Sequence, residues 1–126
     1  MILLTEATKD WTIEAGWRIA PAGVPWIRES YWIKVGAGSY IGDLVTIGNG
    51  VDIGNWVSIG DRAIIGGQVH ISCYSKIGED VHISDGVHIG DQVIIGDGAS
   101  VGEYSCICKG VSIGKNSVTP EYSTLK

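Results

Sequence analysis

A large aliphatic residue recurs at every sixth position between residues 35 and 118, and a small residue follows each of them four places later. The pattern runs through fourteen six-residue units without an insertion or a deletion. In each unit the first residue is β-branched and apolar, the second is Gly in eleven units, and the fifth is Val, Ala or Ser. The first positions are Val35, Ile41, Ile47, Ile53, Ile59, Ile65, Ile71, Ile77, Ile83, Ile89, Ile95, Val101, Ile107 and Ile113. The second positions that are not Gly are Ser72, Ser84 and Cys108.

A six-residue period fits neither a plain strand nor a helix. Side chains repeat every two residues along a strand and every 3.6 along a helix, so neither puts an aliphatic residue at every sixth place. A short extended segment followed by a tight turn does, with the fifth and first positions facing inward and the sixth outward. Three units then form a triangular coil, and equivalent residues of successive coils stack at about 4.8 Å in parallel sheets. The fourteen units predict an all-β rod of about 4.7 coils, roughly 22 Å long.

These units resemble those of the hexapeptide-repeat superfamily. The resemblance covers residues 35–118, which is two thirds of the chain. It implies a single-stranded left-handed parallel β-helix, and proteins of this superfamily usually associate as trimers. The left hand rests on the resemblance alone, because ordinary crossover connections favour the right hand.

Residues 1–34 do not follow the repeat and hold four of the five tryptophans. Trp11 and Trp17 are each followed two residues later by Ile, and this six-residue spacing hints at a degenerate coil. An open β-helix end exposes unpaired backbone and apolar side chains, so we interpret the segment as a Trp-rich cap. The alternative is an aromatic patch that recognises a partner or a ligand ring.

Composition and charge narrow the functional classes. A formal net charge of −5 argues against a general nucleic-acid binder, which would carry a basic face. No signal peptide or apolar run of membrane length is recognisable, and three cysteines form no obvious disulfide framework. We therefore expect a cytoplasmic protein with free thiols that contacts neither nucleic acid nor membrane.

The third and fourth positions of the units carry turn-forming residues. Nine of the third positions are Asp, Asn or Glu, and six of the fourth are Gly or Asn, which tolerate positive φ. Four carboxylates stack in one corner column and form either a polar edge or a site for a hard cation. They belong to Asp43, Asp61, Glu79 and Asp97.

All three histidines lie at outward sixth positions. Stacking of successive coils places Asp52, His70, His88 and Cys106 in one column, and His82 on a neighbouring face. Three interpretations stay open for the histidines. They are surface or trimer-interface residues, a catalytic base, to which imidazole is suited near neutral pH, or, for His70 and His88 with Cys106, zinc ligands.

The resemblance implies a chemistry for these residues. Hexapeptide-repeat acyltransferases use a His near the groove between subunits to deprotonate a hydroxyl or amine that then attacks a thioester, which makes His82, His88 and His70 candidates for the base. The gamma-class carbonic anhydrases of the same fold bind zinc through histidines that lie largely at turns. No His lies at a turn here, so we expect no metal. The long loop that closes many of these active sites is also missing from the repeat.

The end of the repeat offers a second resemblance. Residues 116–123 resemble the exit segment of sugar O-acetyltransferases and serine acetyltransferases, which lies beside the pantetheine arm of CoA. Lys109 and Lys115 occupy consecutive corners of the last units, and they either contact the CoA phosphates or form a solvated basic end. Cys106 faces outward and Cys108 lies at a corner, so we expect their side chains to diverge and neither to be a nucleophile.

The sequence predicts a cap segment (1–34), a β-helix (35–118) and a C-terminal tail (119–126), with Pro120 ending the strand ladder because it lacks an N–H. The expected function is transfer of an acetyl or acyl group from acetyl-CoA or a related thioester to a small hydroxyl or amine acceptor, by a homotrimer. The alternative is a non-catalytic trimeric scaffold or protein-binding module. A gamma-carbonic-anhydrase-like metal site comes third.

Overall fold

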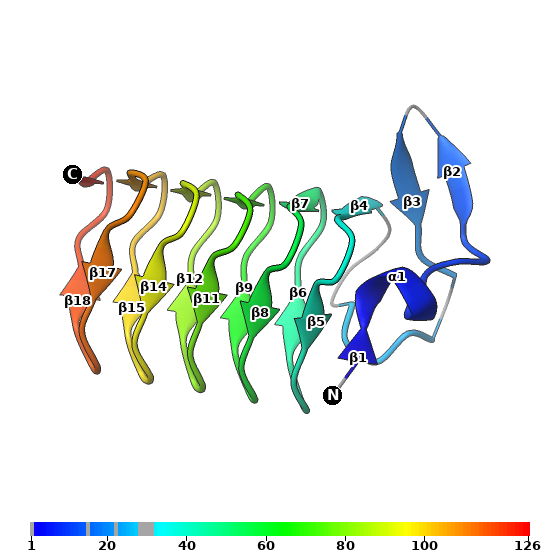
Figure 1. Ribbon diagram of the computed structural model, residues 1–126, viewed down its shortest axis with the longest axis horizontal. Coiled ribbons are helices and arrows are strands. Elements are labelled where there is room, and N and C mark those ends of the chain that lie inside the picture. Colours follow the sequence, from blue (N-terminus) through cyan, green and yellow to red (C-terminus); the bar gives the residue numbers. More distant parts are fainter. Residues whose placement is uncertain (1, 15, 22, 28–31) are drawn as a thin grey trace.

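The chain folds into a left-handed parallel β-helix whose coils stack side by side along one axis, with the N-terminal segment at one end (Figure 1). The computed structural model describes residues 2–14, 16–21, 23–27 and 32–126. Short strands make three flat faces of a prism, and each turn between faces is a corner. We name the faces A, B and C after their sheets.

Each full coil contributes one strand to each face, and the N-terminal segment adds β1 to face A and β2 and β3 to face B. Face A consists of β1 (Ile2–Leu3), β5 (Tyr40–Ile41), β8 (Ser58–Ile59), β11 (Lys76–Ile77), β14 (Ile94–Ile95) and β17 (Ser112–Ile113). Face B consists of β2 (Thr12–Glu14), β3 (Trp17–Ile19), β4 (Trp32–Val35), β7 (Val51–Ile53), β10 (His70–Ile71), β13 (His88–Ile89), β16 (Cys106–Ile107) and β19 (Thr124–Leu125). Face C consists of β6 (Thr46–Ile47), β9 (Ile64–Ile65), β12 (His82–Ile83), β15 (Ser100–Val101) and β18 (Val118–Thr119).

The register confirms the coil predicted from the repeat. His70 pairs with His88 in parallel, and Ile71 pairs with Ile89, so the chain lies above itself after 18 residues. The first positions point into the prism, where Ile71, Ile83 and Ile89 are fully buried. Val, Ala and Ser of the fifth positions fill the remaining space. Burial of these apolar side chains is the main stabilising contribution, about 1.5–3 kcal/mol for each large one.

Buried serines at the fifth position are fully hydrogen-bonded. The hydroxyl of Ser75 donates to the carbonyl of Gly90 at 2.8 Å and accepts the N–H of Val93 at 3.3 Å. Ser39, two coils earlier in the same column, makes the equivalent pair of bonds. A buried hydroxyl with both partners costs little, so these positions accept Ser in place of Val or Ala.

The corners are tight turns whose fourth residue lies in the left-handed region. Among the described residues, ten that are not glycine have φ between 56° and 63°, including Trp56, Tyr74 and Gln92. This conformation was predicted for Gly and Asn, and the structure extends it to bulky residues. The N–H of Gln92 donates to the carbonyl of Cys73 in the preceding coil at 3.0 Å, and the other corners repeat this bond. The bond between coils therefore offsets the strain of the turn.

Replacing Gln92 by Gly should raise the free energy of unfolding by about 0.5–1 kcal/mol, because Gly adopts positive φ without a steric cost. Gly110 is the matched control, since it lies in the same corner column with φ of 76° and nothing within 4 Å of an added Cβ. Gly110→Ala should lower the free energy by a similar amount. Urea unfolding of both variants measures the pair. A loss of stability in Gln92→Gly would mean that the Gln side chain contributes more than the backbone strain costs.

The corner carboxylates hold the backbone of neighbouring coils. Oδ1 of Asp61 accepts the N–H of Asp43 at 2.8 Å, and Oδ1 of Asp97 accepts the N–H of Glu79 at 2.9 Å. Arg62 adds an exposed ion pair to Asp80 at 2.9 Å, and the hydrogen bond from its guanidinium lowers the pKa of the Asp80 carboxyl. These contacts favour the polar edge over a cation site as the reason for the column.

The N-terminal segment caps the open end of the prism. Leu4, in the short helix α1 (Leu4–Ala7), is fully buried, and Trp26 is 7% exposed and stacks on Trp11 with ring centroids 5.4 Å apart. The expected degenerate coil around Trp11 and Trp17 is wrong, because β2 and β3 pair as an antiparallel hairpin that extends face B. Gly16, with φ of 85°, lies in the turn of this hairpin.

The coils continue beyond Val118, where the sequence predicted a tail. β18 pairs with β15, and β19 pairs with β16, so Thr119 and Leu125 occupy two further first positions. Pro120 does not end the ladder. The second-position N–H of each coil donates to the following coil, as Gly102 does to Thr119 at 2.8 Å. A proline at this position therefore leaves every bond to the preceding coil intact.

None of the described helical segments has the length and apolar character needed to cross a bilayer.

Candidate active site

One column on face B brings together a titratable side chain from each of five successive coils. Parallel pairing aligns Lys34 with Asp52, Asp52 with His70, His70 with His88, and His88 with Cys106. Because each is a sixth-position residue, all five point outward from the same face. The column from Asp52 to Cys106 is the one predicted from the sequence, and Lys34 extends it by one coil.

His70 is held on both ring nitrogens. Its Nδ1 lies 3.3 Å from Oδ2 of Asp52, and its Nε2 lies 3.2 Å from Oγ of Ser72. The side chains of His70 and Asp52 are 43% and 33% exposed, so the pair is accessible to a substrate. A carboxylate on Nδ1 fixes the proton there and leaves the lone pair of Nε2 free to accept a proton. His70 therefore has the arrangement of a general base.

The ring of His88 stacks on the ring of His70, with centroids 4.7 Å apart and planes at 10°. This stack limits rotation of His70 on the side away from Asp52. His88 itself is exposed, and in the described part of the chain no hydrogen bond orients its nitrogens. The role of His88 in this geometry is to hold the ring of His70 in place by stacking.

Cys106 and Cys108 lie together, which corrects the expectation that they diverge. Sixth and second positions flank an inward first position, so both face outward on the same side of the strand. Burial is the main cause that raises the pKa of the Cys106 thiol. The charge of Cys108 and a hydrogen bond with Cys108 raise this pKa further. The same geometry brings His70 to Ser72.

A raised pKa predicts slow alkylation of Cys106. The thiolate is the reactive form, so at pH 8 Cys106 should react with iodoacetamide more slowly than the same residue in urea-unfolded protein. Cys108→Ser should accelerate the reaction in part, since burial remains. Peptide mass spectrometry against time and pH measures each thiol. Alkylation of folded Cys106 at the unfolded rate would contradict the prediction.

A groove of about 370 Å³ opens beside the Asp52 end of the column. Its lining joins the hairpin to face B through Ile13, Gly16, Lys34 and Asp52. The ammonium of Lys34 lies 4.6 Å from the centre of the Trp17 ring. Arg18 also lines the groove, but its guanidinium donates to the carbonyl of Thr8 at 2.9 Å. Lys34 is thus the cation best placed to meet an anionic group in the groove.

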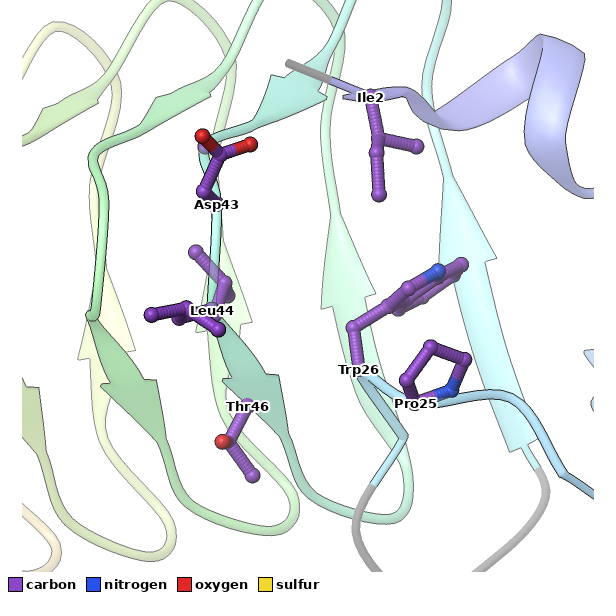
Figure 2. A pocket seen from close by; sticks show the side chains of 8 residues that line it. Ile2, Pro25, Trp26, Asp43, Leu44 and Thr46 are labelled. Carbon is purple, nitrogen blue, oxygen red and sulfur yellow. The ribbon is translucent and has the colours of Figure 1, made fainter.

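A larger hollow of about 650 Å³ lies between the cap and the first coil. Figure 2 shows Ile2, Pro25 and Trp26 of the cap facing Leu44 and Asp43. Its lining is largely apolar and holds no His, Cys or Lys. This hollow offers the carboxylate of Asp43 but no imidazole of the kind that the face B column provides.

The other predicted site residues lie apart from the column. His82 is exposed on face C, between Ile64 and Ser100 of the neighbouring coils. Lys109 follows β16 and Lys115 follows β17, so they occupy different corners at the two ends of β17. Lys109 shares its corner column with Cys73, about 10 Å further along the rod. Lys115 stands above Asp97 in the carboxylate column.

Among residues 2–14, 16–21, 23–27 and 32–126, no three His, Cys, Asp or Glu side chains are arranged to hold a metal ion. The sequence signal for His70 was the eighteen-residue column. Ser72 was missed, although it carried a signal as a side chain at a position that is usually Gly. Lys34 was missed because it precedes the repeat.

Comparison with known proteins identifies the repeat. Residues 74–109 match the family described as bacterial transferase hexapeptide (six repeats), a segment that contains His82 and His88 but not His70. Among solved structures, the chain is similar to a crystal structure from Bacillus cereus provisionally named an acetyltransferase. The two share 21% sequence identity over 78% of this chain and 74% of that chain, with a TM-score of 0.32. No curated protein matches the chain.

Proposed function

Because this chain is a hexapeptide-repeat protein, we propose that it transfers an acyl group from acetyl-CoA or a related thioester to a small hydroxyl or amine acceptor. The observation that carries the proposal is the Asp52–His70 pair at the edge of the groove on face B. A base with a free lone pair and a neighbouring cavity is the minimum that acyl transfer to a hydroxyl or amine requires.

His70 is the base in this proposal. Its Nε2 accepts a proton from the nucleophile as the thioester carbonyl is attacked, and the Asp52 carboxylate stabilises the imidazolium that forms. The proton then passes to the departing sulfur. Within the described residues no carboxylate lies at ion-pair distance from His82 or His88, so we rank them behind His70.

The thioester is proposed to lie along face B toward the C-terminal coils. Lys109 lies on the corner that borders this face, where its ammonium could pair with a CoA phosphate. Lys115, at the far end of β17, would reach the phosphates only with a differently placed cofactor. The acceptor would occupy the groove, where Lys34 favours a molecule with a negatively charged group.

We propose a homotrimer in the cytoplasm as the working form. The exposed outward residues Ile64, Ile94 and Val118 are 37%, 50% and 76% accessible, and apolar side chains on flat faces suit packing against copies of the chain.

The test is turnover of acetyl-CoA with a panel of small alcohols, amino acids and amino sugars, followed by chromatography of free CoA. Calorimetric titration with acetyl-CoA and light scattering on the same sample give stoichiometry and mass. One site per chain in a trimer, with acceptor-dependent release of CoA, is the expected result. Absence of binding to acetyl-CoA and to longer acyl thioesters would refute the proposal.

The second candidate is a non-catalytic trimeric scaffold. It is favoured by the regularity of the rod, since no loop interrupts the described coils between β4 and β19. A trimer without affinity for CoA esters would select this candidate over the enzyme.

A further inference from the structure

Three side chains on face B form a linear relay. Asp52 contacts Nδ1 of His70 at 3.3 Å, and Nε2 of His70 contacts the hydroxyl of Ser72 at 3.2 Å. The fold enforces this order. Asp52 lies one coil before His70, and Ser72 follows His70 by two residues on the same side of the strand. Carboxylate, imidazole and hydroxyl in this order are the components that activate a serine.

Ser72 stands where the repeat otherwise prefers Gly. The second position is Gly in eleven of fourteen units. In the same corner column, a Cβ built on Gly54 would lie 2.9 Å from the nitrogen of Cys73, and one on Gly90 2.7 Å from that of Lys109. A side chain at this crowded position serves packing poorly. The serine is partly exposed, so its hydroxyl can meet a substrate.

Face C contains an internal comparison. His82 and Ser84 have the same spacing and the same positions in their unit as His70 and Ser72. There the coil before His82 contributes Ile64 in place of a carboxylate. Without an acceptor for Nδ1–H, nothing fixes the tautomer that would leave Nε2 free for the serine. The carboxylate, imidazole and hydroxyl are therefore all present at His70 on face B, whereas the carboxylate is missing at His82 on face C.

We infer that Ser72 is a nucleophile that carries the acyl group as a covalent ester during transfer, with His70 as its base and Asp52 as the group that orients His70. This inference rests on the proposed function for the identity of the donor, an acyl thioester. It replaces direct attack of the acceptor on the thioester by two successive acyl transfers.

In the first transfer, Oγ of Ser72 attacks the thioester carbonyl while its proton moves to Nε2 of His70. The new C–O bond forms, the C–S bond breaks, and the proton on His70 passes to the departing thiolate. In the second, the acceptor hydroxyl or amine gives its proton to His70 and attacks the ester carbonyl. The C–O bond to Ser72 breaks, and Oγ recovers the proton. No oxidant or further reactant is needed.

The test uses p-nitrophenyl acetate, an activated ester whose reaction does not depend on CoA recognition. The full chain should release a burst of p-nitrophenol of up to one equivalent, and peptide mass spectrometry should find one acetyl group on Ser72. Ser72→Gly should abolish both signals. That variant carries the most frequent residue of its position and is expected to fold, which circular dichroism checks.

Ser84→Gly is the matched control and should leave the burst and the acetylated Ser72 unchanged. A wild-type protein without acetyl on Ser72, or a Ser72→Gly variant with the full burst, overturns the inference. Quenched reactions with acetyl-CoA separate it from the proposed function. Transfer that persists in Ser72→Gly overturns the covalent step and leaves the acyltransferase standing, whereas acetyl-Ser72 from the ester without consumption of acetyl-CoA supports the nucleophile and refutes the donor.

Discussion

His70→Gln should lower kcat for acyl transfer by about 10²–10⁴-fold, the usual contribution of a positioned general base. The amide retains the approximate size of the ring but cannot accept a proton at the position of Nε2, 3.2 Å from Ser72. Steady-state kinetics at saturating acetyl-CoA measure the loss.

His82→Gln is the control for this variant, because His82 is exposed on face C, away from Asp52. It should keep the wild-type rate. Asp52→Asn should give a smaller loss than His70→Gln, since the amide still contacts Nδ1 but no longer stabilises the imidazolium. A His70→Gln enzyme with wild-type kcat, or a deficit found instead in His82→Gln, would remove His70 as the base.

Ile83→Ala should lower the free energy of unfolding by about 2–5 kcal/mol, the largest stability effect expected for a single substitution in the prism. Ile83 is fully buried between Ile65 and Val101 of the adjacent coils. Neighbours above and below are fixed by strand pairing, so they cannot move in to fill the cavity. Urea unfolding followed by circular dichroism measures the change.

The control is Ile64→Ala, one residue before an equivalent core position but facing outward and 37% exposed. It should cost less than about 1 kcal/mol in the separated chain. If trimer contacts bury this face, the cost should instead grow with protein concentration. Equal losses for Ile83→Ala and Ile64→Ala at low concentration would contradict the inward–outward assignment.

The β-helix was predictable because every unit repeats the same pattern of apolar and turn-forming residues. Ile71 and Ile89 are placed by the same turn chemistry, so one correct unit fixes all the others and the eighteen-residue register with them. The limit of this reasoning appears at Thr119. Threonine has the shape of valine and fills a first position, but the following Pro120 suggested that the strand ladder ends there.

The sequence predicted that the N-terminal segment covers the end of the prism, but it did not predict the hairpin in this segment. Trp26 and Leu4 cover the apolar end, as expected of large residues before an open coil. The six-residue spacing of Trp11 and Trp17 suggested a coil, but the same spacing arises in a hairpin, in which the backbones of Glu14 and Trp17 pair between β2 and β3. Local pattern does not distinguish parallel stacking from antiparallel pairing, which depends on how the segment folds back on the chain.

The site was predictable where it depends on the repeat. Asp52, His70 and His88 follow from counting eighteen residues along the sequence. The groove could not be predicted in this way, because Gly16 and Ile13 reach it through the hairpin, whose position is set by non-local contacts. The contact between His70 and Ser72 required recognising that second positions face outward, a point that Gly at most of them conceals.

The eighteen-residue register allows the length of the rod to change by whole coils, but it fixes the face on which each residue lies. Insertion of one whole coil between β10 and β13 would move His88 away from His70 by one rung, yet leave Asp52, His70 and Ser72 as neighbours. Insertion of a single residue would rotate every later side chain to a different side of the prism and turn Ile89 outward. Insertions and deletions tolerated by such a chain should therefore be whole coils, which leave the residues of each face on that face.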